Sequence, residues 1–151
     1  MSLVVSLAVK KGIASILLLQ DGSVVSKEVY KIKSEVADGL YSQLINTFKN
    51  ALLFSRGYIE SNNIEDVIFE VNNSAFKGWI DNQYSKEAYQ KDFYNMWQVL
   101  QTIPITYRVI VSDKPKALLY CSESYIKKPK LSGLDSLAEF KDKEESGVGL
   151  C

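Results

Sequence analysis

The strongest constraint on the fold lies in the first 32 residues, where three apolar runs are separated by two turn signals. Those runs are residues 3–9 (LVVSLAV), 13–20 (IASILLLQ) and 24–32 (VVSKEVYKI). Apolar and β-branched residues in runs of this length favour strands. The first break is Lys-Lys-Gly at 10–12, and the second is Asp-Gly at 21–22, a strong hairpin signal. The chain is therefore expected to open with a three-stranded antiparallel meander.

A long amphipathic helix is expected next. Ser34 is a suitable N-cap, and Glu35 and Asp38 fall in the first turn, where the helix dipole favours acids. Apolar residues then recur every four positions, at Val36, Leu40, Leu44, Phe48 and Leu52. This period places them on one buried face. Gly57 is the predicted stop of the helix.

The remaining elements complete a mixed α/β order. Residues 67–71 predict a fourth strand, parallel to a meander strand because a helix links the two. A short helix over 74–80, a second long helix from its cap Ser85 through Gln101, and a fifth strand over 105–111 follow. Residues 117–121 read as a short strand or a helix start. The predicted fold class is α/β, with a mixed five-stranded sheet flanked by helices.

Several segments resemble the ribonuclease H-like superfamily in order and spacing. The stretch VIFEVNNSAFKGWIDN at 67–82 resembles the family's fourth strand, its catalytic turn and a helix that ends in a Trp-Ile-x-Asn step. MWQVL at 96–100, ITYRVIV at 105–111 and LDSLAEF at 134–140 resemble its later helix, last strand and C-terminal helix. The resemblance implies a single ribonuclease H-like domain over 1–130, followed by an acidic tail over 131–151 that is partly helical or disordered.

The family cleaves the RNA strand of RNA–DNA hybrids with two divalent metals held by four carboxylates, whose charge must offset that of the cations. The resemblance maps those ligands onto Ser6 or Ala8 in the first strand, Asp38 in the first helix, Asn72 after the fourth strand and Asp135 in the last helix. At most two of the four positions are then acids. This mapping predicts a degenerate member that has no metal, no cofactor and no catalytic residue, and that is not an enzyme.

Glu70 is the exception to that mapping, because it lies two residues before Asn72 and so on the same face of the strand. A shifted ligand there keeps a divergent metal-dependent nuclease open as an alternative. Histidine is absent from the chain, which removes the commonest general base and the family's loop histidine.

Nucleic-acid binding is the predicted function, as an accessory factor in replication, recombination or transcription. The 18 basic and 18 acidic residues cancel, so any contact with phosphates must come from a local patch. The family has a basic segment after the Trp-Ile-x-Asn step. In the corresponding segment here, residues 83–95, two lysines are balanced by two acids. The candidate residues lie in and before YIKKPK, namely Lys114, Lys116, Tyr125, Lys127, Lys128 and Lys130. The expected partner is an RNA–DNA hybrid, a duplex or a single strand.

A protein–protein module that docks through the acidic tail is the alternative function. Residues 131–151 carry 2 basic and 5 acidic residues. The two cysteines, Cys121 and Cys151, stand in no motif and fit a reducing compartment. No apolar run is long enough for a membrane span. These features predict a cytoplasmic protein without a membrane partner, and the Asn- and Lys-rich composition is what a bacteriophage protein in its host's cytoplasm would show.

Overall fold

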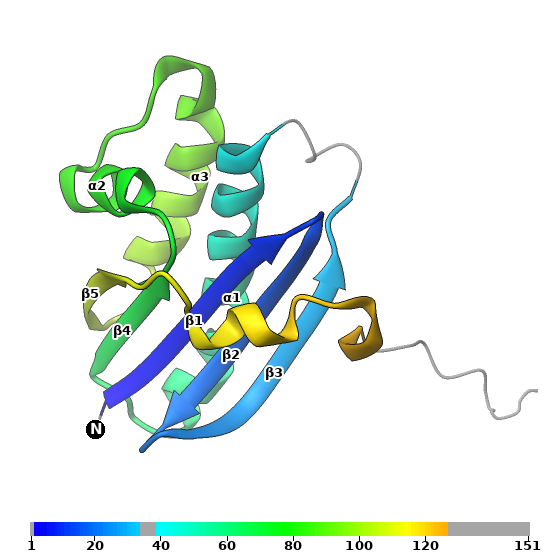
Figure 1. Ribbon diagram of the computed structural model, residues 1–151. Coiled ribbons are helices and arrows are strands. Elements are labelled where there is room, and N and C mark those ends of the chain that lie inside the picture. Colours follow the sequence, from blue (N-terminus) through cyan, green and yellow to red (C-terminus); the bar gives the residue numbers. More distant parts are fainter. Residues whose placement is uncertain (1, 34–38, 127–151) are drawn as a thin grey trace, which may run out of the picture.

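A mixed five-stranded sheet forms the centre of the computed structural model, which describes residues 2–33 and 39–126 (Figure 1). The strands are β1 (Ser2–Lys10), β2 (Ile13–Gln20), β3 (Ser23–Lys31), β4 (Asp66–Val71) and β5 (Thr106–Val111). Their order across the sheet is β3-β2-β1-β4-β5. β1, β2 and β3 pair antiparallel, whereas β4 pairs parallel to β1 and to β5. The predicted meander, the parallel fourth strand and the α/β fold class are confirmed.

The two meander turns have the backbone conformation that their residues favour. Lys11 and Gly12 have φ angles of 52° and 77°, and Asp21 and Gly22 have 52° and 80°. Two consecutive residues in the left-handed region match the right-handed twist of the flanking strands. The turn residues therefore fix the strand pairing locally.

Helix α1 (Leu40–Ser61) follows the meander and runs past the predicted stop. Gly57 lies inside the helix, and Ile59 beyond it is only 2% exposed. Glycine inside a helix costs about 1 kcal/mol relative to alanine, while burying an isoleucine contributes roughly 1.5–3 kcal/mol, so burial decides the helix length. The predicted helix start, with Ser34 and Asp38, lies outside the described residues.

The helical part between β4 and β5 is more divided than predicted. Helix α2 (Ser74–Asn82) is capped by Asn73, whose side chain accepts a hydrogen bond from Phe76 N at 2.8 Å. A 3-10 turn, η2 (Glu87–Tyr89), then precedes helix α3 (Gln90–Gln101). Ser85 was predicted to cap this helix, which is wrong, because its hydroxyl instead donates to the carbonyl oxygen of Lys86 at 3.2 Å.

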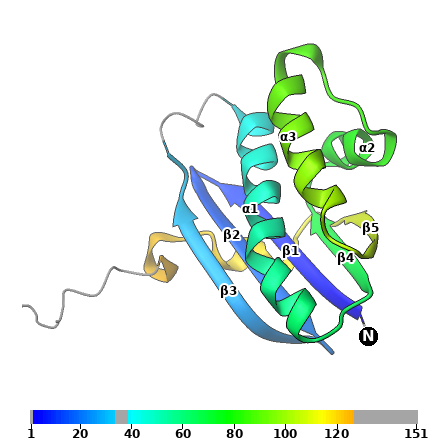
Figure 2. The same cartoon turned by 180° about the vertical axis from the view of Figure 1, so that it is seen from behind.

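Helices α1 and α3 cover one face of the sheet (Figure 2). The core on this face is built from large side chains that are buried completely or nearly so, including Leu7, Phe48, Phe69, Phe76 and Met96. β1 contributes its odd-numbered residues to this core, so its even-numbered residues point to the opposite face.

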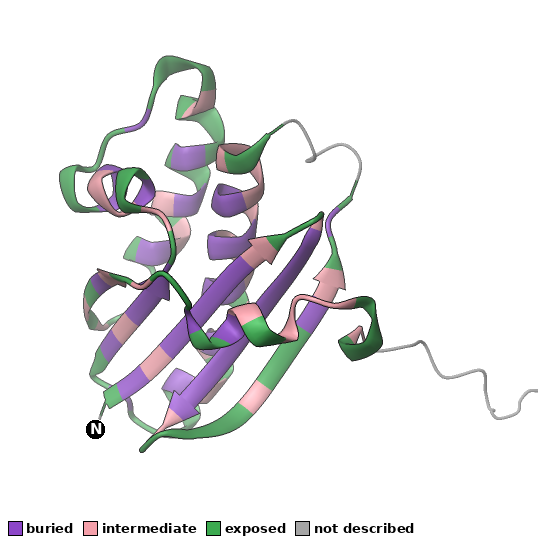
Figure 3. Cartoon of the chain, in the orientation of Figure 1, coloured by how far each residue is buried: buried purple, intermediate pink, exposed green. Residues whose placement is uncertain are grey.

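The opposite face is crossed by the segment after β5, here named the strap (residues 112–126) (Figure 1). The strap contains two 3-10 turns, η3 (Lys116–Tyr120) and η4 (Glu123–Tyr125). Residues 117–121, predicted as a strand or a helix start, belong mainly to η3. Figure 3 shows that most of the strap is exposed or of intermediate burial, and its buried residues are Pro115 and Ala117. Of the helices that the structure describes, none has the length and apolarity to cross a bilayer.

Candidate nucleic-acid interface at the strap

Ser6 and Glu70 form a polar pair at the centre of the strap-covered face. They are register partners in the parallel β1–β4 ladder, and their side chains project to the same side. Ser6 Oγ donates a hydrogen bond to Glu70 Oε1 at 2.8 Å. Ser6 is fully buried and Glu70 is 6% exposed. A buried carboxylate needs such donors, because its desolvation is otherwise unfavourable.

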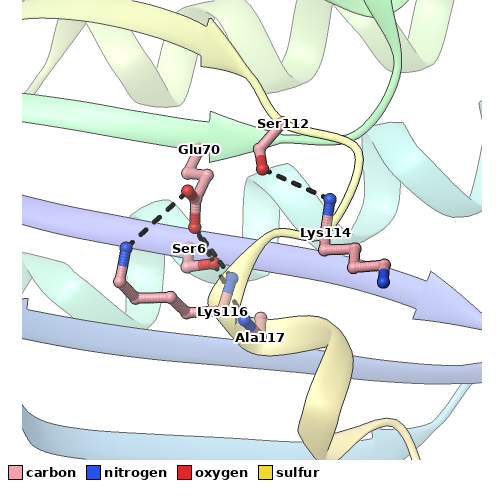
Figure 4. A network of polar contacts seen from close by, with 6 residues as sticks. All are labelled: Ser6, Glu70, Ser112, Lys114, Lys116 and Ala117. Atoms are coloured by element: carbon pink, nitrogen blue, oxygen red, sulfur yellow. Dashed lines mark hydrogen bonds and ion pairs between the residues drawn. The ribbon is translucent and has the colours of Figure 1, made fainter.

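The strap completes this network with its main chain (Figure 4). The Lys116 amide donates to Glu70 Oε1 at 2.9 Å, and the Ala117 amide donates to Ser6 Oγ at 2.9 Å. Lys116 Nζ lies 4.0 Å from Glu70 Oε2 and forms an ion pair with it. Side chains of β1 and β4 therefore hold the strap by accepting hydrogen bonds from its main-chain amides. The carboxylate of Glu70 lies beneath the strap.

The local sequence explains why the strap fits closely here. Pro115 caps η3 with φ −60° and ψ 148°, values that its ring favours, and it directs the next two amides at the sheet. Ala117 is fully buried in a small cluster with Ala8, Leu17 and Leu19. A larger side chain than alanine would push the strap away from the sheet.

The metal-ligand positions inferred from the family resemblance are only partly brought together. Ser6 lies in the network, whereas Ala8 is buried under the strap. Asn72 is exposed one residue beyond β4 and takes no part in the network. Asp38 and Asp135 lie outside the described residues. Within residues 2–33 and 39–126, no three His, Cys, Asp or Glu side chains gather as metal ligands would.

Three of the predicted nucleic-acid contacts lie on the strap. Lys114 and Lys116 are exposed, and Tyr125 is 44% exposed. Tyr125 packs edge-on against Tyr120 with 4.9 Å between ring centroids, and Lys27 Nζ of β3 lies 4.9 and 5.1 Å from the two rings. Tyr125 thus anchors the end of the strap to β3. Lys127, Lys128 and Lys130 lie outside the described residues.

Sequence reasoning missed two residues beside the strap, Lys10 and Cys121. Lys10 ends β1 and lies two residues after Ala8, so strand alternation could have placed it on the strap face. Cys121 Sγ donates to the Ala8 carbonyl oxygen at 3.6 Å. Burial raises the pKa of the Cys121 thiol to about 11, against a smaller opposing effect of Lys10. No sequence motif marks this thiol.

Comparison with known proteins identifies the fold. No protein-family model and no curated protein sequence matches the chain. Among solved structures, RNase H1 from the halophilic archaeon Halobacterium salinarum superposes with a TM-score of 0.55 at 9% identity, over 83% of this chain and 94% of that one. The chain has a ribonuclease H-like fold. LC11-RNase H1 in complex with an RNA/DNA hybrid gives a TM-score of 0.53 at 11% identity, over 83% of this chain and 95% of that one.

A third ribonuclease H-like neighbour is the N-terminal RNase H domain of a Mycobacterium tuberculosis protein. It superposes with a TM-score of 0.52 at 7% identity, over 83% of this chain and 93% of that one. The recognition of the family's fold from the sequence is confirmed, and at these identities the similarity concerns the fold.

The prediction that the chain is not an enzyme is contradicted, because these structural neighbours are RNase H enzymes. That prediction counted carboxylates by transferring ligand positions between sequences that share 7–11% of their residues. At such low sequence identity, a metal-binding acid can occupy another position on the strand or another element while the fold stays the same. The count also depended on Asp38 and Asp135, which the described residues do not include.

Proposed function

We propose that this ribonuclease H-like chain binds nucleic acid at the strap-covered face of its sheet, as an accessory factor in replication, recombination or transcription. The observation that carries the proposal is the pair of exposed lysines, Lys114 and Lys116, which the Glu70 network holds on that face. Contacts between lysine and phosphate supply most of the affinity of sequence-independent binding.

The neighbouring strands add positive charge to the same face. Lys10 extends from the end of β1, and Lys27 Nζ lies over the rings of Tyr120 and Tyr125. Arg108 of β5 is the register partner of Ile68, and strand alternation places both on the side of Glu70. Glu70, which lies beneath the strap, is buried and paired with Lys116 Nζ at 4.0 Å, so the lysine offsets its negative charge.

Fluorescence anisotropy with labelled RNA–DNA hybrid, DNA duplex and single strands tests this function. EDTA in the buffer prevents metal-dependent cleavage from consuming the probes. We expect the affinity to fall steeply between about 50 and about 200 mM salt. A Lys114→Gln/Lys116→Gln variant is expected to bind about tenfold more weakly, with a salt slope smaller by roughly 1.5–2.

The matched control is a Lys33→Gln/Lys49→Gln variant, which loses the same charge on the side of α1. This control is expected to bind like the unaltered chain. The proposed function is wrong if none of the probes shows salt-dependent binding at micromolar protein, or if the two double variants lose affinity equally.

A further inference from the structure

A pocket opens beside the strap, at the C-terminal end of β1. Its volume is about 580 Å³, and it is lined by Lys10, three leucine or proline side chains of the strap, Lys114, Lys116 and Cys121. Among residues 2–33 and 39–126, no acidic side chain lines it. A concave site that combines several cations with apolar walls is a binding site for an anion that carries an apolar or aromatic group.

Two lysines supply the charge that is free for a ligand. Figure 4 shows the Lys114 side chain running along β1 toward the arrow end of the strand, whereas Lys116 reaches in the opposite direction to Glu70. Lys10 is the last residue of β1 at that arrow end. Over the part of the chain that the structure describes, the ion pairs join Lys77 to Asp81 and Lys116 to Glu70, so neither Lys10 nor Lys114 has an acidic partner there.

The apolar lining is unusually exposed. Leu119 is 81% exposed at the rim of the pocket, and Leu118 is partly buried against the cluster below. Cys121 adds no negative charge near neutral pH, because burial raises the pKa of its thiol to about 11. The described lining of the pocket therefore presents cations and apolar surface together, and it includes no anionic side chain.

We propose that this pocket binds a phosphate monoester on a nucleotide, with the phosphate between Lys10 and Lys114 and the base or sugar against Leu118 and Leu119. The phosphate dianion matches two ammonium groups that have no acidic partner among the described residues. The inference rests on the proposed function and specifies it: the phosphorylated end of a nucleic-acid strand is one source of this chemistry, and a free mononucleotide is the other.

The test compares ligands with and without the phosphate on the full chain. Calorimetry with 5′-AMP, adenosine and inorganic phosphate measures the affinity of the pocket for small ligands. Anisotropy with single strands that carry a 5′-phosphate or a 5′-hydroxyl measures the affinity for strand ends. We expect AMP to bind at least tenfold more tightly than adenosine. We also expect the 5′-phosphorylated strand to bind about tenfold more tightly than its 5′-hydroxyl counterpart.

Substitutions then show whether the preference for phosphate-bearing ligands comes from the pocket. Lys10→Gln and Lys114→Gln are each expected to abolish the preference for phosphate, whereas Lys49→Gln on α1 keeps it. An independent measurement uses a Cys151→Ser variant, in which AMP is expected to slow alkylation of Cys121, since that thiol lines the pocket. Lys10 takes no part in the network of Ser6, Glu70 and the strap, so the folded state should survive its substitution.

The outcomes separate the two proposals. Salt-dependent strand binding without AMP binding and without a 5′-phosphate preference would overturn the pocket and leave the proposed function in place. AMP binding that depends on Lys10, without binding of any strand, would keep the pocket and overturn the proposed function. Equal affinities for AMP and adenosine would show that the lysines do not hold the phosphate, and would also overturn the pocket.

Discussion

The two faces of the sheet are built by different means. The face under α1 and α3 buries large apolar and aromatic side chains, such as Phe48 and Phe69, whose ring centroids lie 4.8 Å apart. The face under the strap buries small residues, such as Ala8 and Ala117, around the hydrogen-bonded Ser6 and Glu70. Apolar area on the first face provides most of the stability, and the second face positions charges at the surface.

This difference also separates stability from binding. A side chain on the helix-covered face acts by filling space, and it can be exchanged only for one of similar volume. On the strap-covered face, directional hydrogen bonds from main-chain amides hold the strap, so the exposed side chain of Lys114 can vary without removing them. Three pairs of substitutions test this contrast.

Truncation in the helix-covered core is expected to have the largest effect. Phe48→Ala removes a fully buried ring that contacts Phe69 and Phe76, and it should lower the free energy of unfolding by about 3–5 kcal/mol. Leu118→Ala, on the partly buried inner side of the strap, serves as the matched truncation and should cost less than about 2 kcal/mol. Urea unfolding followed by circular dichroism measures both, and equal losses would remove the distinction between the faces.

Removing the carboxylate of Glu70 is expected to have an intermediate effect. Glu70→Leu leaves the Lys116 amide and the Ser6 hydroxyl without their acceptor and should cost about 1–3 kcal/mol. Glu70→Gln retains one side-chain oxygen that can accept from both groups, so its loss should be clearly smaller. The same urea titration measures both variants. A leucine variant as stable as the glutamine variant would show that these hydrogen bonds do not hold the strap.

Releasing the end of the strap is expected to have the smallest effect. Lys27→Gln removes the ammonium group over Tyr120 and Tyr125 and should cost about 0.5–1 kcal/mol. Lys27→Arg keeps a cation that can stack on the rings and should be nearly neutral. Thermal unfolding combined with hydrogen exchange of the strap amides measures the change. Faster exchange in the arginine variant than in the glutamine variant would contradict the assigned contact.

Local patterns were sufficient to predict the sheet. Alternating apolar runs and Asp-Gly turn chemistry specify the meander, and a connecting helix implies the parallel fourth strand. The error at Gly57 arose because burial of Ile59 is a tertiary effect that outweighs a local preference. Helix α3 begins later than predicted because a separate 3-10 turn precedes it.

The site was harder to predict than the fold. Strand alternation placed Glu70 on the right face, but nothing local indicated that residues 46 positions later would cover it. Short 3-10 turns have no long apolar period, so the strap gave only a weak signal in the sequence. Asn72, chosen by position in a motif, lies outside the network. The domain boundary at residue 130, the role of the tail and the cytoplasmic location stay predictions.

The hydrogen bond from the Ala117 amide to Ser6 Oγ joins residues that are 111 positions apart. On the ribosome, where a chain emerges from its N-terminus, β1 leaves well before the strap. During synthesis the meander and α1 can pack while Ser6 still faces water. The strap-covered face, and with it the pocket at Lys10, is completed only after the rest of the sheet has formed.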